Sequence, residues 1–289
     1  MPFELRHQIS QLADSKFWLQ LCDGFSLTEE TPLADLSSGD SRKFDRDDNW
    51  HVCKELIAEE GYFVYHEWFD TDFVDRLAGG ILKLRDEGIP PVFCFVYDEY
   101  WNLLQQLHPL FEDLVGEYWL LPAVWAWHVT YDNQSAFTPH RDQLRDVAPE
   151  EEEHLDYLTV WIPLTDLDHL NSSISILPAS CDPDYDGETE AIRVENLQSI
   201  RSLQAKRGAV MCWTTGLAHW GTSQTKYGNE RISVGLYLQN PEVECFDPPP
   251  MDFSRPFPLA ERLTLIANQI VNYARTDDLL EYAKVILAE

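Results

Sequence analysis

The stretch that decides the fold is Leu155-Asp-Tyr-Leu-Thr-Val-Trp-Ile-Pro-Leu164. Aromatic and hydroxyl-bearing side chains alternate along it with aliphatic ones, and this period of two is typical of a β-strand whose two faces pack differently. Similar strand-forming composition recurs in the second half of the chain at residues 123–130, 173–177, 209–213 and 232–238. Loops that carry Gly, Pro, Asn and Asp separate these segments. The second half is therefore predicted to be built from strands.

The first part of the chain and its end have a helical pattern, because apolar residues recur there at helical spacing. Helices are expected at about 3–21, 51–60, 73–84, 99–117 and 258–288. Two short strands are expected between the first helices, at 61–65 and 92–96. A helical front followed by a strand-rich half indicates the α+β class.

We predict one domain over residues 1–289, in which the strands close into a double-stranded β-helix (a jelly roll) with helices packed on one side. Residues 1–60 would form a helical wrapping segment, 61–240 the jelly-roll core and 248–289 the C-terminal helices. Two long loops, around 146–153 and 181–207, interrupt the strands. Such loops serve as lids in some barrels and are mere decoration in others.

Acidic residues dominate the charge of the chain, since 50 Asp and Glu against 21 Lys and Arg give a formal net charge of −29. Such a surface repels phosphate backbones and anionic lipids, so we expect no nucleic-acid partner and no membrane partner. A small-molecule or peptide substrate fits better. Solubility alone is the simpler explanation for most of this charge.

The six cysteines are spread along the chain without a CxxC pair, which favours reduced thiols over a disulfide framework or a zinc site. The opening residues MPFELRHQIS lack the basic and apolar blocks of a signal peptide, and no apolar run is long enough to span a bilayer. We therefore expect a cytoplasmic protein. The sequence leaves the oligomeric state open.

The segment Thr138-Pro-His-Arg-Asp142 carries two side chains that bind metals, His140 and Asp142. Residues two apart on an extended backbone point to the same face, so this imidazole and this carboxylate can share one cation. His219, at the end of a predicted strand, supplies a third ligand. Two histidines and one carboxylate form the facial triad of non-haem iron(II) oxygenases. By itself an HxD motif is weak evidence, and a hydrogen-bonded loop pair is the alternative.

A second pair of side chains, Arg231 and Ser233, opens the predicted strand that follows His219. The two share one face, and a guanidinium with a hydroxyl is a matched receptor for a carboxylate. A cosubstrate that chelates iron at one end and carries a carboxylate at the other would need this pair. A surface ion pair is the alternative role for Arg231.

Several motifs resemble, in order and spacing, the phytanoyl-CoA dioxygenase-like (PhyH) family of iron(II)- and 2-oxoglutarate-dependent oxygenases. The resemblance covers roughly residues 51–240. The matching segments are Glu59–Val64, His140–Asp142, Trp161–Asn171, Ser173–Ser180, Gly208–Trp213, His219 and Arg231.

The resemblance implies that His140, Asp142 and His219 hold Fe(II), and that Arg231, Ser233 and Trp161 contact 2-oxoglutarate. It also implies an enzyme that uses O2 to hydroxylate or otherwise oxidise a C–H bond of a small-molecule metabolite, with release of succinate and CO2. The retained Asp142 favours hydroxylation over halogenation, because halogenating relatives have a small residue at that position.

The chain departs from the family in two places. Ala179-Ser-Cys181 stands where the family has Gly-Ser-His, which leaves the metal ligands untouched. Gly221 occupies a place where some members have a hydroxyl near the cosubstrate, and Ser233 would supply that donor instead. Nothing in the chain favours a coenzyme-A substrate.

Three alternatives remain at this stage: a catalytically silent jelly-roll scaffold, an enzyme using another metal, and a peptide or protein hydroxylase. Weaker site candidates, with roles in the pocket wall, in packing or at the surface, are Trp125, Trp127, His128, Tyr131, Arg141, Gln143, His154, His169 and Trp220. Alternation along 123–130 requires half of that strand to face away from any pocket. Arg141 should point away from the metal and form a structural ion pair.

Overall fold

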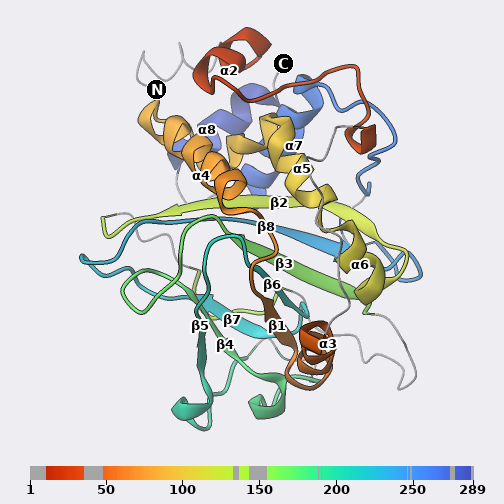
Figure 1. Cartoon of the computed structure of the whole chain (residues 1–289), viewed down its shortest axis with the longest axis vertical. Coiled ribbons are helices and arrows are strands. Elements are labelled where there is room, and N and C mark those ends of the chain that lie inside the picture. The colour runs from red at the N-terminus through yellow and green to blue at the C-terminus, as the bar shows by residue number, and fades with distance from the viewer. Residues whose placement is uncertain are drawn as a thin grey trace.

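The computed structural model describes residues 11–35, 48–132, 137–142, 155–187, 189, 191–245, 247, 249–273 and 277–287. Within these ranges helices occupy the first part of the chain, antiparallel strands follow, and helices end it (Figure 1). The expected α+β class is confirmed. Residues 3–10 of the first expected helix, and the expected loop at 146–153, lie outside the described residues.

The strands form two antiparallel sheets, a larger one in the order β1-β6-β3-β8-β2 and a smaller one in the order β5-β4-β7. The strands of the larger sheet are β1 (Tyr62–Tyr65), β2 (Trp119–Val129), β3 (Tyr157–Pro163), β6 (Val210–Trp213) and β8 (Arg231–Gln239). Those of the smaller sheet are β4 (Ile174–Leu177), β5 (Arg201–Leu203) and β7 (Ala218–Gly221).

The helices gather mainly on one side of the larger sheet, and the smaller sheet lies on the other side (Figure 1). Their bounds are α2 (Ser15–Leu21), α3 (Asp48–Glu60), α4 (Thr71–Asp86), α5 (Asp98–Gln105), α6 (His108–Val115), α7 (Leu259–Tyr273) and α8 (Asp277–Ile286). In the ranges that the structure describes, no helix is both long and apolar enough to cross a membrane.

The two faces of the larger sheet contribute to two separate hydrophobic cores. Ile232 and Val234 of β8 belong to the core shared with the helices. Trp161 of β3 packs instead in the core shared with the smaller sheet. Because neighbours along a strand point to opposite faces, Arg231 and Ser233 are turned towards the smaller sheet. The space between the sheets is therefore where the predicted site residues lie.

Local sequence explains how the covering helices begin and how they are anchored. The Asp70 side chain caps α4 by accepting hydrogen bonds from the backbone N–H groups of Asp72 and Phe73. On α7, the fully buried Arg262 pairs with Asp98 of α5, with 2.7 Å between Nη1 and the carboxylate oxygen. This ion pair ties the C-terminal helix to the helical layer.

Three sequence predictions need correction. The strand expected at 92–96 is a buried 3-10 helix, Pro91–Val96, because an unbroken apolar run led by proline suits a buried helical turn as well as a strand. The single helix expected at 99–117 is two, α5 and α6, separated where Pro109 opens the second one. The expected loop at 181–207 contains the short strand β5. The C-terminal helices expected within 248–289 are α7 and α8.

Candidate metal centre

The HxD segment lies beside strand β7, which carries His219. The backbone of His140 pairs with that of His219 through two hydrogen bonds, of 3.1 and 3.0 Å, as in an antiparallel ladder. The backbone N–H of Asp142 donates to the carbonyl of Thr215 at 2.9 Å. The segment is therefore extended and fixed at both ends, which turns His140 and Asp142 to one side.

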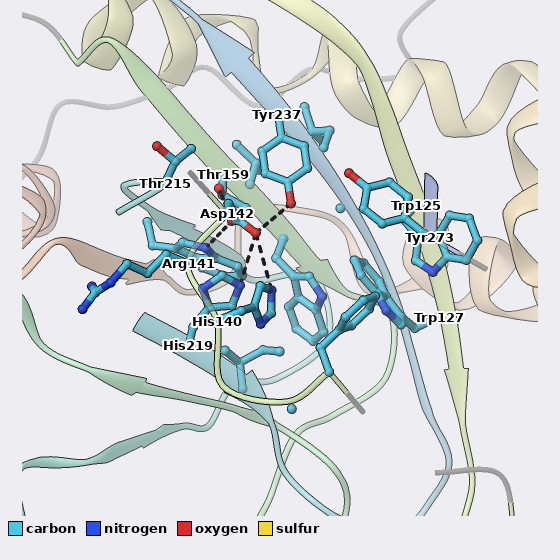
Figure 2. Close-up of a pocket in the computed structure, with 18 of the residues that line it drawn as sticks. Trp125, Trp127, His140, Arg141, Asp142, Thr159, Thr215, His219, Tyr237 and Tyr273 are labelled. Carbon is cyan, nitrogen blue, oxygen red and sulfur yellow. Dashed lines mark hydrogen bonds and ion pairs between the residues drawn. The ribbon is translucent and has the colours of Figure 1, made fainter. Parts of the chain in front are cut away.

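The structure brings the three predicted ligand side chains together (Figure 2). Their ligand atoms all lie within 4.8 Å of one another. Asp142 Oδ1 is 3.6 Å from Nε2 of His140 and 3.6 Å from Nε2 of His219. A metal ion between these three atoms would have three protein ligands on one side and open positions on the other.

Hydrogen bonds orient both imidazole rings towards the carboxylate. Nδ1 of His140 lies 2.7 Å from the Thr138 carbonyl oxygen, and Nδ1 of His219 lies 3.0 Å from that of Leu217. A carbonyl only accepts, so each Nδ1 carries the proton and each Nε2 keeps its lone pair. Metal-binding histidines are usually held in this way by their second nitrogen.

Three donors surround the Asp142 carboxylate. Thr159 Oγ1 and Trp213 Nε1 donate to Oδ2, at 2.8 and 3.2 Å. The Tyr237 hydroxyl donates to Oδ1 at 2.9 Å. None of these three residues was predicted to belong to the site. Thr159 shares a strand face with Trp161 on β3, and Tyr237 shares one with Arg231 and Ser233 on β8, so the two-residue period was an available signal for these two. Trp213 lies on β6, where no predicted site residue gave such a signal.

The charge states at the centre suit a cation. Burial opposes ionisation of Asp142, but His219, His140 and the Thr159 hydroxyl hold the pKa of its carboxyl well below the ordinary value. Burial lowers the pKa of His219, although the Asp142 charge works in the other direction. A carboxylate beside a neutral imidazole is the protonation state that metal binding requires.

Arg231 is buried, and it forms no ion pair with any residue that the structure describes. It is 2% exposed, and its Nε and Nη1 have no hydrogen-bond partner within the described part of the chain. Burial lowers its pKa to about 10. Its guanidinium carbon lies 5.7 Å from the centre of the Trp161 ring. The Ser233 hydroxyl, two residues along the strand, is also buried and also has no hydrogen-bond partner among the described residues. The surface ion pair considered for Arg231 is therefore wrong.

A cavity of about 390 Å³ joins the His-Asp-His cluster to Arg231. Seven aromatic side chains also line it: Trp125, Trp127, Phe137, Trp161, Trp213, Tyr237 and Tyr273. The last of these comes from the end of α7, so the C-terminal helix contributes to the cavity. No local pattern in the sequence connects that helix to the site.

The other candidates divide between cavity and surroundings. Trp125 and Trp127 face the cavity, whereas His128 alternates with them and hydrogen bonds to Glu230. Arg141 donates to Asp182 at 2.7 Å and to the Gly216 carbonyl at 2.6 Å, away from the metal ligands. The remaining candidates lie elsewhere: Tyr131 and His169 are exposed, Trp220 does not line the cavity, and Gln143 and His154 lie outside the described residues.

Comparison with known proteins identifies the fold. No protein-family model matches the chain, and no curated protein sequence matches it. HygX from Streptomyces hygroscopicus, solved with nickel, 2-oxoglutarate and hygromycin B bound, is 14% identical, with 66% of this chain and 87% of that chain covered and a TM-score of 0.52.

Two further solved structures are similar. SnoK, a non-haem α-ketoglutarate-dependent carbocyclase from nogalamycin biosynthesis, is 15% identical, with 78% of this chain and 98% of that chain covered and a TM-score of 0.52. ThoJ, a non-haem monooxygenase, is 12% identical, with 81% and 98% covered and a TM-score of 0.54. At these identities the likeness establishes the fold: the chain is folded like these non-haem enzymes.

Proposed function

We propose that this chain is a mononuclear non-haem iron(II) oxygenase that uses 2-oxoglutarate and O2 to oxidise a C–H bond of a small-molecule metabolite. One observation carries the proposal. A single cavity contains a His-Asp-His cluster and a buried guanidinium whose Nε and Nη1 have no hydrogen-bond partner among the described residues. The first feature fits a metal, and the second fits an anionic ligand, since no described residue supplies the anion.

His140, Asp142 and His219 would hold the iron. Their donor set, two imidazole nitrogens and one carboxylate oxygen, suits Fe(II), and the hydrogen bonds on both Nδ1 atoms keep the Nε2 atoms available. When bound, iron(II) and 2-oxoglutarate supply the activation of O2 and the oxidation of the substrate C–H bond, with succinate and CO2 as the other products. The protein's own part is to position and to exclude water.

Arg231 and Ser233 would bind the far carboxylate of 2-oxoglutarate. A buried cation is unfavourable unless it is paired, and a carboxylate accepted by Nε, Nη1 and the Ser233 hydroxyl would satisfy all three orphan groups at once. Trp161 would form the wall beside this carboxylate, since its ring already lies against the guanidinium.

We further infer that the two sheets constitute a jelly-roll core of the phytanoyl-CoA dioxygenase-like type, within a single catalytic domain over 1–289. The likeness to solved non-haem enzymes supports the roll. The segments 1–60, 61–240 and 248–289 keep the roles expected of them, and a cytoplasmic location remains the expectation.

A small molecule is the favoured substrate class. The cavity volume, about 390 Å³, suits a metabolite-sized ligand, and the similar HygX has been solved with hygromycin B bound. Hydroxylation is the favoured outcome. A silent scaffold is disfavoured, because it would have no use for a buried unpaired charge beside three metal-binding side chains. A peptide hydroxylase would need a groove open at both ends.

Anaerobic visible absorption tests the proposal. Apoprotein receives Fe(II) and then 2-oxoglutarate, and a charge-transfer band is expected in the wild type but not in His140→Ala. Arg231→Ala should need roughly a hundredfold more oxoglutarate, because a buried charge pair is lost. Arg193→Ala, whose side chain is 63% exposed, is the matched control and should titrate like the wild type. A folded, metal-loaded protein without a band would refute the oxygenase reading.

A further inference from the structure

The indole nitrogen of Trp127 is a buried polar atom. This Nε1 atom has no hydrogen-bond partner among the residues that the structure describes. A buried indole N–H normally finds an acceptor, because leaving it unpaired costs free energy. Trp127 lines the same cavity as Arg231, so this orphan donor needs an acceptor that the cavity would hold.

The strand register places Trp127 beside the carboxylate receptor. On the antiparallel pair β2 and β8, Trp127 lies directly opposite Ser233, and Val129 lies opposite Arg231. Directly opposite residues share a face and are close neighbours, and diagonal residues two positions along remain within reach of a long side chain. The indole N–H, the Ser233 hydroxyl and the guanidinium are therefore orphan donors on one patch of one sheet face.

A glycine keeps the indole in this place. A Cβ atom on Gly235 would lie 2.9 Å from one carbon of the Trp127 ring and 3.0 Å from the next. The ring therefore lies directly over the glycine backbone, and any side chain at residue 235 would force it to move. The Trp127 ring also packs edge-on against the Phe137 ring, with 6.2 Å between the ring centroids. Phe137 belongs to the segment that leads into the HxD motif.

We propose that Trp127 is a cosubstrate-binding residue whose indole N–H donates to the far carboxylate of 2-oxoglutarate, together with Arg231 and Ser233. The inference rests on the proposed function, and it adds a third donor from a different strand. Two oxygens of one carboxylate offer about four acceptor positions, which is enough for this set of donors. The indole would also exclude water from the ion pair, which strengthens it.

If the indole N–H donates to the far carboxylate, its removal should weaken the binding of a dicarboxylate more than that of a monocarboxylate. 2-Oxopentanoate has the same chelating 2-oxo acid as 2-oxoglutarate but a methyl group in place of the far carboxylate. A hydrogen bond to a charged group corresponds to roughly a tenfold to hundredfold change in affinity, so Trp127→Phe should lower the affinity for 2-oxoglutarate by about that factor. The affinity for 2-oxopentanoate should change by less than about twofold, because that ligand never makes the bond.

The experiment is an anaerobic titration of the Fe(II)-loaded full chain with each of the two acids, followed by visible absorption. The proteins are the wild type, Trp127→Phe and Trp125→Phe. Trp125 lies two residues earlier on the same strand and on the same side of the cavity (Figure 2), so its variant controls for the loss of an indole from that wall. Trp125→Phe should bind 2-oxoglutarate within about twofold of the wild type.

Each outcome decides the inference. A selective loss of 2-oxoglutarate affinity in Trp127→Phe supports it, whereas an equal loss for both acids, or no loss, overturns it. If the Phe variant does not fold, Gly235→Ala tests the same bond, because it keeps Trp127 and displaces its ring; unchanged selectivity there overturns the inference as well. If the wild type gives no band with either acid, the proposed function itself fails, which is a different result.

Discussion

Replacing Arg231 with methionine should make the metal-free protein more stable while removing its response to 2-oxoglutarate. Burial lowers the pKa of this guanidinium to about 10, well below its ordinary value. At about 1.4 kcal/mol per pH unit, the difference corresponds to roughly 3 kcal/mol of unfavourable burial of the charge at neutral pH. Methionine has a similar length and no charge, so the free energy of unfolding should rise by roughly 1–3 kcal/mol.

Arg262 provides the matched control, because it is equally buried but fully paired. Its guanidinium contacts Asp98 and donates to the carbonyls of Phe257, Val96 and Thr28. Arg262→Met would leave the Asp98 carboxylate buried and unpaired, so a loss of about 3–5 kcal/mol is expected. Replacement by methionine should thus raise the free energy of unfolding at one buried arginine and lower it at the other.

The assay is urea denaturation of metal-free protein at neutral pH, with thermal melting in Fe(II) with and without 2-oxoglutarate. Wild type should melt at a higher temperature when 2-oxoglutarate is present, since a ligand that binds only the folded state stabilises it, and Arg231→Met should not respond. A loss of stability in Arg231→Met comparable to that in Arg262→Met would refute the reasoning. The guanidinium would then be satisfied within the protein and would not await a ligand.

Three further predictions concern the metal centre. Tyr237→Phe removes the hydroxyl that donates to Asp142 and should weaken Co(II) binding roughly tenfold, measured by absorption titration of the apoprotein. Burial lowers the pKa of His219, so near pH 6.5, the ordinary pKa of histidine, the unfolded chain binds more protons than the folded one. The free energy of unfolding of the metal-free protein should therefore fall as the pH is lowered from about 7 to about 5.5. The fall should be smaller in His219→Asn. Asp182→Asn breaks the buried pair with Arg141 and should cost about 3 kcal/mol in urea denaturation, with weaker Co(II) binding as well.

Exposed counterparts supply the controls for these variants. Tyr227→Phe, at a residue that is 75% exposed, should leave Co(II) affinity unchanged. Asp86→Asn, whose side chain is 65% exposed and pairs with the half-exposed Arg85, should cost less than about 1 kcal/mol. Equal effects in a variant and its control, or the same pH slope in wild type and His219→Asn, would contradict the corresponding prediction.

Much of the strand layout followed from local pattern. The expected strands at 61–65, 123–130, 173–177, 209–213 and 232–238 are confirmed within a few residues as β1, β2, β4, β6 and β8. Alternation of side chains is a property of the strand itself, so a short window of sequence displays it. The run at 92–96 was assigned wrongly because it has no alternation, and only its packing decides between strand and buried helix.

For this protein, the sequence by itself was enough to predict two pairs of side chains that each share a strand face. His140 and Asp142 share a face because they are two residues apart on an extended chain, and Arg231 and Ser233 do so for the same reason. Only the tertiary structure decided that the His-Asp-His cluster and Arg231 line one cavity, that Arg231 has no counter-ion among the described residues, and that Tyr273 of α7 reaches the wall. Convergence and burial depend on contacts between segments far apart along the chain, and no local pattern encodes them.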